Sequence, residues 1–295
     1  MLKLKTNTLW LSLLVSVTLT VSAPLSLAAE NGGSSYMPGF YGDFGMATMP
    51  APGNYFSNFW GYNTASNRTD SSNLTLELPG VVHVTDQNIL GGRYWFGFYP
   101  YVLRTESQSP TNHSTRGGAG DMYALPLALS WQWQQLSLLI FEGVVVPTGT
   151  YQKERALNSG RNYWTFDQNL SLTWQPDESY DFSLTLGYMV NTKNTDSQYR
   201  TGDEIHLDYF AGYYITKQLG LGVAGSYYRQ VTPDTGSGVP VDAVKGEASS
   251  IGPVVLYNTR LFDHDVSFST KWLHEYNVNN HIPGDYVIMR TTFEF

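Results

Sequence analysis

The chain has 295 residues, of which 14% are charged and 15% are aromatic, and its formal net charge is −8. Soluble domains usually carry about 25% charged residues, so the composition favours a membrane β-barrel with aromatic girdles, although an exported soluble protein stays open. The acidic balance argues against nucleic acid as a partner. The chain contains no cysteine, so its stability cannot come from disulfides.

The first 29 residues have the order of charge, apolar core and small residues that is typical of a secretory signal peptide. Residues 1–5 are short and basic, residues 9–21 are mostly apolar, and small residues follow. We predict cleavage after Ala28 or Ala29. The alternative is a membrane anchor, but the apolar core is shorter than the ~20 residues that a spanning helix needs.

Residues 30–54 form a lead-in that is rich in glycine and proline and shows no periodicity. Glycine and proline interrupt regular structure, so the pattern predicts a flexible segment. Such a segment could be a disordered periplasmic tail or could fold into a barrel as a plug. The sequence leaves both possibilities open.

Residues 122–133 alternate between apolar and small or polar side chains with a period of two, which is typical of a β-strand. One face is expected to meet lipid, with aromatic residues at both ends and leucine between them: Tyr123, Leu125, Leu127, Leu129, Trp131 and Trp133. The opposite face is expected to line the lumen. Similar alternation recurs at 164–174, 182–190, 205–215, 219–230 and 266–275, and more weakly at 55–65, 80–86, 91–104, 136–146 and 247–258.

The last ten residues alternate in the same way and end on Phe295. A terminal aromatic residue is common in the closing strand of an outer-membrane barrel. We therefore predict that residues 55–295 form an all-β, transmembrane antiparallel barrel of about twelve strands, within a range of about ten to fourteen. The terminal strand is also the expected contact with the barrel-assembly machinery, and outer-membrane lipids are expected to surround the barrel.

Several features conflict with this prediction or constrain it. Pro100, Pro126 and Pro253 fall inside candidate strands, and a proline there requires a β-bulge or a different strand boundary. Glu142 is expected to face the lumen, which would leave Leu139, Phe141 and Val145 facing lipid. The polar segments 107–120, 191–202 and 231–246 are expected to be the longer, outer connections. An exported β-sandwich, whose strands also alternate, is the main rival fold.

Seven short segments resemble the outer-membrane transporter family associated with the meta-cleavage pathway of phenol degradation. They are Gly118–Asp121, Pro147–Tyr151, Asn158–Trp164, Tyr199–His206, Tyr228–Thr232 with Asp234, Gly252–Pro253 and the terminal Phe295. The similarity covers roughly residues 52–295 and depends on the order and spacing of these pieces. It implies a bacterial outer-membrane barrel that passes aromatic compounds, and it implies no established catalytic residues.

Inward-facing polar residues are the candidates for contact with a solute. Glu204, His206 and Asp208 share one strand face; together they could bind a divalent cation, but a polar lumen row is the simpler interpretation, and we assign no metal and no cofactor. Tyr163, Tyr228 and Gln230 also face inward by parity and could contact an aromatic solute. Four charged residues on two neighbouring strands could set a field across the pore or form a salt-bridge network that plugs it: Lys271, Glu275, Arg290 and Glu294.

The sequence therefore predicts an outer-membrane channel for small hydrophobic or aromatic compounds. The alternative is a barrel that transports nothing and acts as a structural or surface-interaction protein through its polar loops. No phosphate loop, dinucleotide motif or nucleophile–base arrangement is evident, so an enzyme is not predicted.

Overall fold

The computed structural model describes residues 29–30 and 33–295, and the described chain folds into one antiparallel sheet of 14 strands. The strands are β1 (Gly53–Ser66), β2 (Ser71–Ile89), β3 (Gly92–Tyr99), β4 (Val102–Ser109), β5 (Asn112–Ala119), β6 (Met122–Trp133), β7 (Leu136–Val146), β8 (Thr165–Trp174), β9 (Tyr180–Asn191), β10 (Glu204–Tyr214), β11 (Leu219–Gln230), β12 (Glu247–Leu261), β13 (His264–Asn279) and β14 (Gly284–Glu294). In the described part of the chain, no helix is long and apolar enough to cross a membrane.

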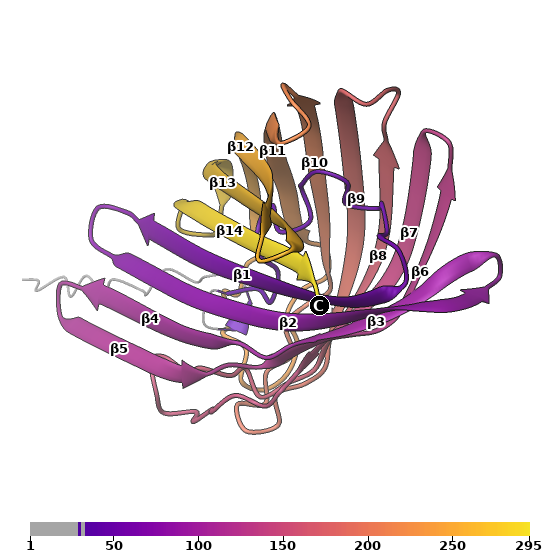
Figure 1. The fold of residues 1–295 in the computed structure, drawn as a ribbon. Helices are drawn as coiled ribbons and strands as arrows, with labels where there is room; N and C mark the ends of the chain where they lie inside the picture. The colour runs from indigo at the N-terminus through magenta and orange to yellow at the C-terminus, as the bar shows by residue number, and fades with distance from the viewer. Residues whose placement is uncertain (1–28, 31–32) are drawn as a thin grey trace, which may run out of the picture.

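Twelve of the strands close into a barrel (Figure 1), because β1 pairs with β14 on one side and with β2 on the other. The first strand meets the last in register from Tyr55 opposite Glu294 to Ala65 opposite Gly284. A closed sheet has no free edge within the ring, so every strand of the ring finds backbone partners inside the bilayer. The predicted fold class and strand number are confirmed, and the sandwich is wrong.

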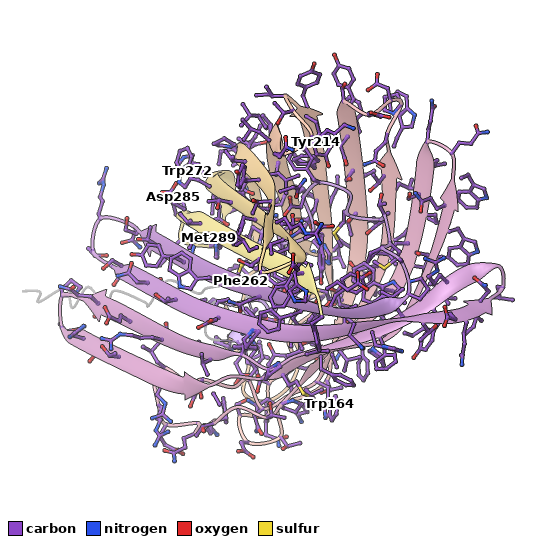
Figure 2. All side chains as sticks on the ribbon, in the orientation of Figure 1. Trp164, Tyr214, Phe262, Trp272, Asp285 and Met289 are labelled. Atoms are coloured by element: carbon purple, nitrogen blue, oxygen red, sulfur yellow. The ribbon has the colours of Figure 1, made fainter. Side chains whose placement is uncertain are left out.

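Strict alternation is clearest in β8 and β9, where the predicted faces are correct. In β8, Asp167, Asn169 and Ser171 are buried toward the interior, whereas Phe166, Leu170 and Leu172 are exposed on the outside. The same outward exposure is found on the last strands, where Trp272 and Met289 are labelled in Figure 2. The exposed apolar side chains form the surface that contacts lipid in a membrane barrel.

The predicted faces are wrong in the first part of β6 and throughout β7. A β-bulge at residues 125–126 shifts the register of β6 against both β3 and β7, so Tyr123 and Leu125 point inward although Leu127, Leu129 and Trp131 point outward as expected. In β7, Leu139, Phe141 and Val145 are buried inside, and Glu142 lies on the outer face. In β6, one extra residue reverses the orientation of every side chain on one side of the bulge. β7 pairs with β8 in continuous register, so its faces follow from strand pairing, which places Glu142 outside.

The three prolines are accommodated in different ways. Pro126 lies at the bulge, as required, and Pro100 lies between β3 and β4, so the single strand predicted over 91–104 is two strands. Pro253 is neither at a bulge nor at a boundary: it pairs in register with Val223 of β11, and the ladder to β13 lacks pairs at residues 252 and 253. Pro253, which has no N–H donor, therefore lies where the β12–β13 ladder is interrupted.

The segment 107–120 is part of a hairpin, which corrects the prediction of a long loop. Strands β4 and β5 pair with each other, and β4 also pairs with the first half of β2, from Ser71 to Glu77. This hairpin continues the sheet outside the ring and lies below β2 in Figure 1. Its residues are polar or glycine at most positions, which explains why their strand periodicity was not apparent.

The connections alternate in length around most of the barrel. Short turns at 134–135, 175–179, 215–218 and 262–263 join strands at one end, and long segments at 147–164, 192–203 and 231–246 join them at the other. By the usual pattern of bacterial barrels, the long connections mark the outer end. The predicted signal peptide lies almost entirely outside the described residues.

Candidate functional site

The glycine-rich lead-in runs through the barrel interior, where its indigo trace is seen in Figure 1. We call residues 33–52 the lumen segment. Just before it, Glu30 accepts hydrogen bonds from Tyr151 and Asn194, which belong to two of the long connections. Near its end, Arg93 donates to the carbonyl oxygen of Pro50 at 3.1 Å, beside the short turn between β2 and β3. The segment therefore passes from the outer end of the barrel to the opposite end.

One wall of the interior, formed by β8–β10 and β13–β14, holds the lumen segment through hydrogen bonds. The Tyr36 hydroxyl donates to Asp208 at 2.8 Å, and the Tyr41 hydroxyl donates to Asp167 at 3.0 Å. Backbone amides of the segment add further bonds: Gly45 N donates to Asp181 and Ala47 N donates to Thr173, each at 2.9 Å. We call this surface the polar wall.

His206 is at the centre of the polar wall and is completely buried. Its Nε2 lies 3.0 Å from Asp167 and its Nδ1 lies 3.3 Å from Asp208. The Tyr36 ring stacks on the imidazole with a centroid distance of 4.2 Å, and the Tyr41 ring lies nearly parallel at 5.5 Å. The imidazole rests over Gly187, where any Cβ would collide with it. The two carboxylates that position His206 thus also anchor the segment.

Asp43 connects the lumen segment to two cations of the barrel. Its carboxylate lies 3.6 Å from Lys271 and 3.5 Å from Arg290, and it accepts a hydrogen bond from Ser269 at 2.7 Å. Lys271 also donates to the carbonyl oxygens of Gly39 and Gly42, at 2.8 Å each. Burial by itself would raise the pKa of Asp43, but the charges of Arg290 and Lys271 and the Ser269 hydrogen bond outweigh it and hold the pKa below its ordinary value.

The opposite wall, formed by β1–β3, β6 and β7, meets the lumen segment through apolar side chains. We call it the apolar wall; its inward residues include Leu76, Leu78, Val82, Val84, Trp95, Tyr99, Leu125, Leu139 and Phe141. Against it pack the aromatic and methionine side chains of the segment, namely Met37, Phe40, Met46 and Met49. Phe40 meets Phe59 of β1 at a centroid distance of 4.5 Å. This side of the interior is therefore mainly apolar. A second, smaller apolar cluster lies at the polar wall, where Phe44 of the segment packs against Phe210 at a centroid distance of 4.5 Å and belongs to one cluster with Leu273.

Trp95 is distinctive within the apolar wall. Its side chain is 6% exposed, and its indole Nε1 is buried without a hydrogen-bond partner. A buried donor without an acceptor costs about 1–3 kcal/mol. The apolar wall thus contains one unused donor.

The predicted site residues occupy several separate environments. Glu204 accepts hydrogen bonds from Tyr228 at 2.5 Å and Asn191 at 2.9 Å. Gln230 donates to Asp234 at 2.7 Å, and Tyr163 is buried near the outer end. Of the described residues, no group of three or more His, Asp or Glu has an arrangement that could hold a metal ion. Glu204, His206 and Asp208 share a face, but only His206 and Asp208 contact each other, whereas Glu204 bonds to other residues.

The four predicted charged residues do not form one ring. Lys271 and Arg290 converge on Asp43, whereas Glu275 accepts bonds from the Gly284 amide at 2.8 Å and the Tyr286 hydroxyl at 3.2 Å. Glu294 is exposed at the barrel rim. Sequence reasoning missed Tyr36, Tyr41, Asp43 and Trp95. The aromatic residues and the single Asp43 within the glycine-rich lead-in were the available signal, since a purely flexible tail rarely needs buried rings.

The family model described as "Putative MetA-pathway of phenol degradation" matches residues 61–291. An outer-membrane channel from Pseudomonas putida F1 superimposes with a TM-score of 0.74 at 14% identity, covering 88% of this chain and 100% of that chain. The β domain of the Bordetella autotransporter BrkA gives 0.47 at 13% identity (83% and 100% covered), and the CymD monoaromatic hydrocarbon channel gives 0.44 at 9% (85% and 90%). At these identities the likeness concerns the fold alone. No curated protein matches the sequence.

Proposed function

From the premise that this chain belongs to the family described as "Putative MetA-pathway of phenol degradation", we propose that it is an outer-membrane channel for small hydrophobic or aromatic compounds. The lumen segment closes the channel at rest. The observation that carries the proposal is the contact between the segment and the apolar wall, because barrels that pass polar solutes usually have a polar interior.

The proposed route follows the apolar wall. Methionine side chains are flexible and polarisable and can repack around aromatic rings of different shape. Met46 and Met49 pack against this wall, and Met37 contacts both this wall and the Phe44 cluster. Phe40 and Phe59 offer ring faces to a passing aromatic compound. Trp95 Nε1 supplies one donor to a hydroxyl, carbonyl or carboxylate oxygen of the solute.

The polar wall has a different role in this proposal. Its hydrogen bonds and the Asp43 pairs hold one face of the lumen segment, while the other face can yield to a solute. The polar residues predicted to face the lumen then act mainly by holding the segment and the loops. Direct contact with solute is proposed only for those that become exposed when the segment moves. These residues are Tyr163, Glu204, His206, Asp208, Tyr228, Gln230, Lys271, Glu275, Arg290 and Glu294.

Location in the outer membrane is part of the proposal. The barrel fold, which is similar to that of the Pseudomonas putida outer-membrane channel, and the exposed apolar belt support it. We further propose that the signal peptide is cleaved after Ala28 or Ala29, and that the strand ending in Phe295 is recognised by the barrel-assembly machinery. An enzymatic activity is not proposed.

Flux through reconstituted protein tests the function. Vesicles that carry lipopolysaccharide are prepared with wild type, with a variant lacking residues 33–49, and without protein, and entry of radiolabelled catechol and arabinose is followed. We expect wild type to admit catechol faster than empty vesicles, and the deletion to admit both solutes faster than wild type.

Two controls sharpen this experiment. A shift in gel mobility on boiling establishes that each variant is folded as a barrel. In the full-length protein, Trp95→Phe should slow catechol entry. In the deletion variant, the same substitution should leave arabinose entry unchanged. Equal catechol entry into wild-type, deletion and empty vesicles would refute transport and favour a structural or surface-interaction barrel.

A further inference from the structure

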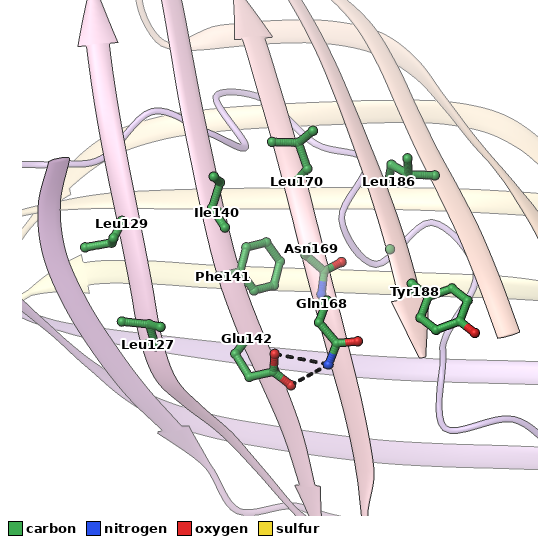
Figure 3. Close-up of a pocket in the computed structure, with 11 residues that line it drawn as sticks. Leu127, Leu129, Ile140, Phe141, Glu142, Gln168, Asn169, Leu170, Leu186 and Tyr188 are labelled. Carbon is green, nitrogen blue, oxygen red and sulfur yellow. Dashed lines mark hydrogen bonds between the residues drawn. The ribbon is translucent and has the colours of Figure 1, made fainter. Parts of the chain in front are cut away.

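The outer surface of the barrel has a cavity of about 350 Å³ on the side that contacts lipid. Outward side chains of four consecutive strands line it (Figure 3): Leu127 and Leu129 of β6, Ile140 and Glu142 of β7, Gln168 and Leu170 of β8, and Leu186 and Tyr188 of β9. Its size falls within the range of about 300–1,000 Å³ that is typical of small-molecule pockets. It lies on the outer surface of the ring, and Phe141, Asn169 and Gly187, which occupy inward positions of the same strands, complete its lining.

A carboxylate and an amide occupy this otherwise apolar surface. Gln168 Nε2 donates to both carboxylate oxygens of Glu142, at 2.9 and 3.1 Å. Glu142 follows Ile140 on the outer face of β7, and Gln168 lies between Phe166 and Leu170 on the outer face of β8. Ionisable residues are rare at such positions because lipid does not solvate them. Two aliphatic residues would fit the belt better, so the fold itself does not account for the pair.

The local backbone gives the cavity its shape. Leu127 is paired with Glu142 immediately after the β6 bulge, and two residues of β6, Leu125 and Pro126, lie opposite Gly143 alone. The bulge therefore turns Leu127 outward beside the carboxylate. On the inner side, Tyr123 covers Gly143 so closely that a Cβ there would lie 2.3 Å from its hydroxyl. Bulges often direct a side chain toward a site.

We propose that this cavity binds small apolar molecules that carry one hydrogen-bond donor, such as a phenolic hydroxyl, and that are dissolved in the membrane. The apolar body would rest on Leu129, Ile140 and Leu186. The hydroxyl would donate to Glu142, whose carboxylate oxygens each retain further lone pairs. Charge-assisted hydrogen bonds are strong away from water. The ligand would therefore supply the hydrogen-bond donor that lipid acyl chains lack.

Other occupants fit the chemistry less well. An acyl chain fills the cavity but offers no donor to the carboxylate. A second copy of the chain could offer a donor, but the polar pair lines a hollow together with leucines and isoleucine. The neighbouring Tyr188 hydroxyl is turned to Asp203 at 3.0 Å. A small molecule can reach this pair without a large complementary surface. The proposal concerns binding on the outside of the wall and does not depend on transport through the lumen.

Binding of p-cresol and p-xylene tests the site, because the two probes have nearly the same shape and only p-cresol has a hydroxyl. The full-length protein is placed in lipid nanodiscs, and saturable binding of each labelled probe is measured against empty nanodiscs. We expect one saturable p-cresol site per chain in wild type and no saturable p-xylene site. Glu142→Leu should weaken p-cresol binding roughly tenfold or more, the effect of losing a hydrogen bond to a charged group.

Three further variants separate the site from general partitioning. Leu186→Trp fills the cavity without removing Glu142 and should also abolish saturable binding, and Gln168→Leu should weaken it. Val255→Leu lies on the outer face of β12, away from the cavity, and should leave binding unchanged. Heat-dependent gel mobility checks that each variant is folded.

The proposal is overturned if p-xylene binds as tightly as p-cresol, or if Glu142→Leu binds p-cresol like wild type. It is also overturned if wild type is a dimer that Glu142→Leu converts to a monomer, since the cavity would then be a contact between copies of the chain. Neither result would bear on catechol flux through the lumen, which is measured separately.

Discussion

The polar wall and the apolar wall contact the same short segment but hold it by different physical means. Besides the packing of Phe44 against Phe210, the polar wall uses directional bonds with defined donors and acceptors. Examples are the bond from Tyr36 to Asp208 and the bonds from Lys271 to the segment's backbone carbonyls. The apolar wall uses contacts between Met46, Phe40 and their neighbours that have no required geometry. Directional bonds break when a segment shifts slightly, whereas apolar contacts can re-form around a new shape.

The two kinds of contact explain how a packed lumen can still admit a solute. The polar wall specifies where the segment lies, and the apolar wall leaves one side on which a hydrophobic molecule can replace one apolar contact by another. Substitutions on the polar wall should therefore release the lumen segment from the barrel wall. Substitutions on the apolar wall should affect the rate of solute entry more than the binding of the segment.

The largest effect is expected for Lys271→Met. The substitution removes a buried cation, so Asp43 loses one of its two countercharges and two carbonyl groups lose their donor; removing one partner of a buried ion pair costs about 3–5 kcal/mol. Hydrogen exchange of the Gly45 and Ala47 amides should accelerate by about two to three orders of magnitude. Thr270→Met creates the same residue on the outer face of β13 and serves as the matched control. Unchanged exchange in Lys271→Met would contradict the role given to the polar wall.

Acid should weaken docking through Asp43. The docked segment holds the pKa of Asp43 below its ordinary value, so this contribution is fully present above the ordinary value, about 3.9, and is lost as the pH falls through the lowered value. The charged groups near Asp43 are Lys271, Arg290 and the like-charged Asp181. Exchange of the Ala47 amide, which donates to the non-ionisable Thr173 hydroxyl, should accelerate relative to its intrinsic rate only below about pH 4. Asp43→Asn should reduce this acid response. A transition near neutral pH would be inconsistent with a lowered pKa.

A smaller effect is expected for Tyr36→Phe. The variant keeps the ring that stacks on His206 but removes the hydroxyl, so Asp208 loses a donor; the loss should be about 1.5–3 kcal/mol, as for a hydrogen bond to a charged group. Exchange of the same two amides measures it. Tyr213→Phe, on the outer face of β10, is the control and should have no effect. If both variants behave alike, the hydroxyl is not an anchor.

The smallest effect on docking is expected for Met46→Leu on the apolar wall. The swap nearly conserves volume and should cost less than about 1.5 kcal/mol, so amide exchange should rise by less than about tenfold. The rate of catechol entry should change by a larger factor than the amide exchange rate, because leucine adapts less readily to a passing ring. An increase in exchange as large as that of Tyr36→Phe would remove the distinction between the walls.

Much of the fold was predictable from sequence because lipid and lumen impose opposite chemistry on alternate residues. In β8 and β9 this alternation identifies both the strand and its faces, from Phe166 to Tyr188. The inward positions of Glu204, His206 and Asp208 follow from the same parity. Their partners do not, since Asp167 and Tyr36 come from elsewhere in the chain.

A barrel of about twelve strands and the faces of its regular strands can be inferred from residue order alone, because a period of two is a local property of the chain. The faces around the β6 bulge, the β4–β5 hairpin and the course of the lumen segment depend on contacts between distant residues. A bulge is defined by the partner strand, and one extra residue there turns Tyr123 inward. The sequence predicts Glu142 in the lumen, whereas the pairing of β7 with its neighbours places it on the outer face. The segment between Gly33 and Pro52 has no period at all, so its path depends on long-range contacts with both walls.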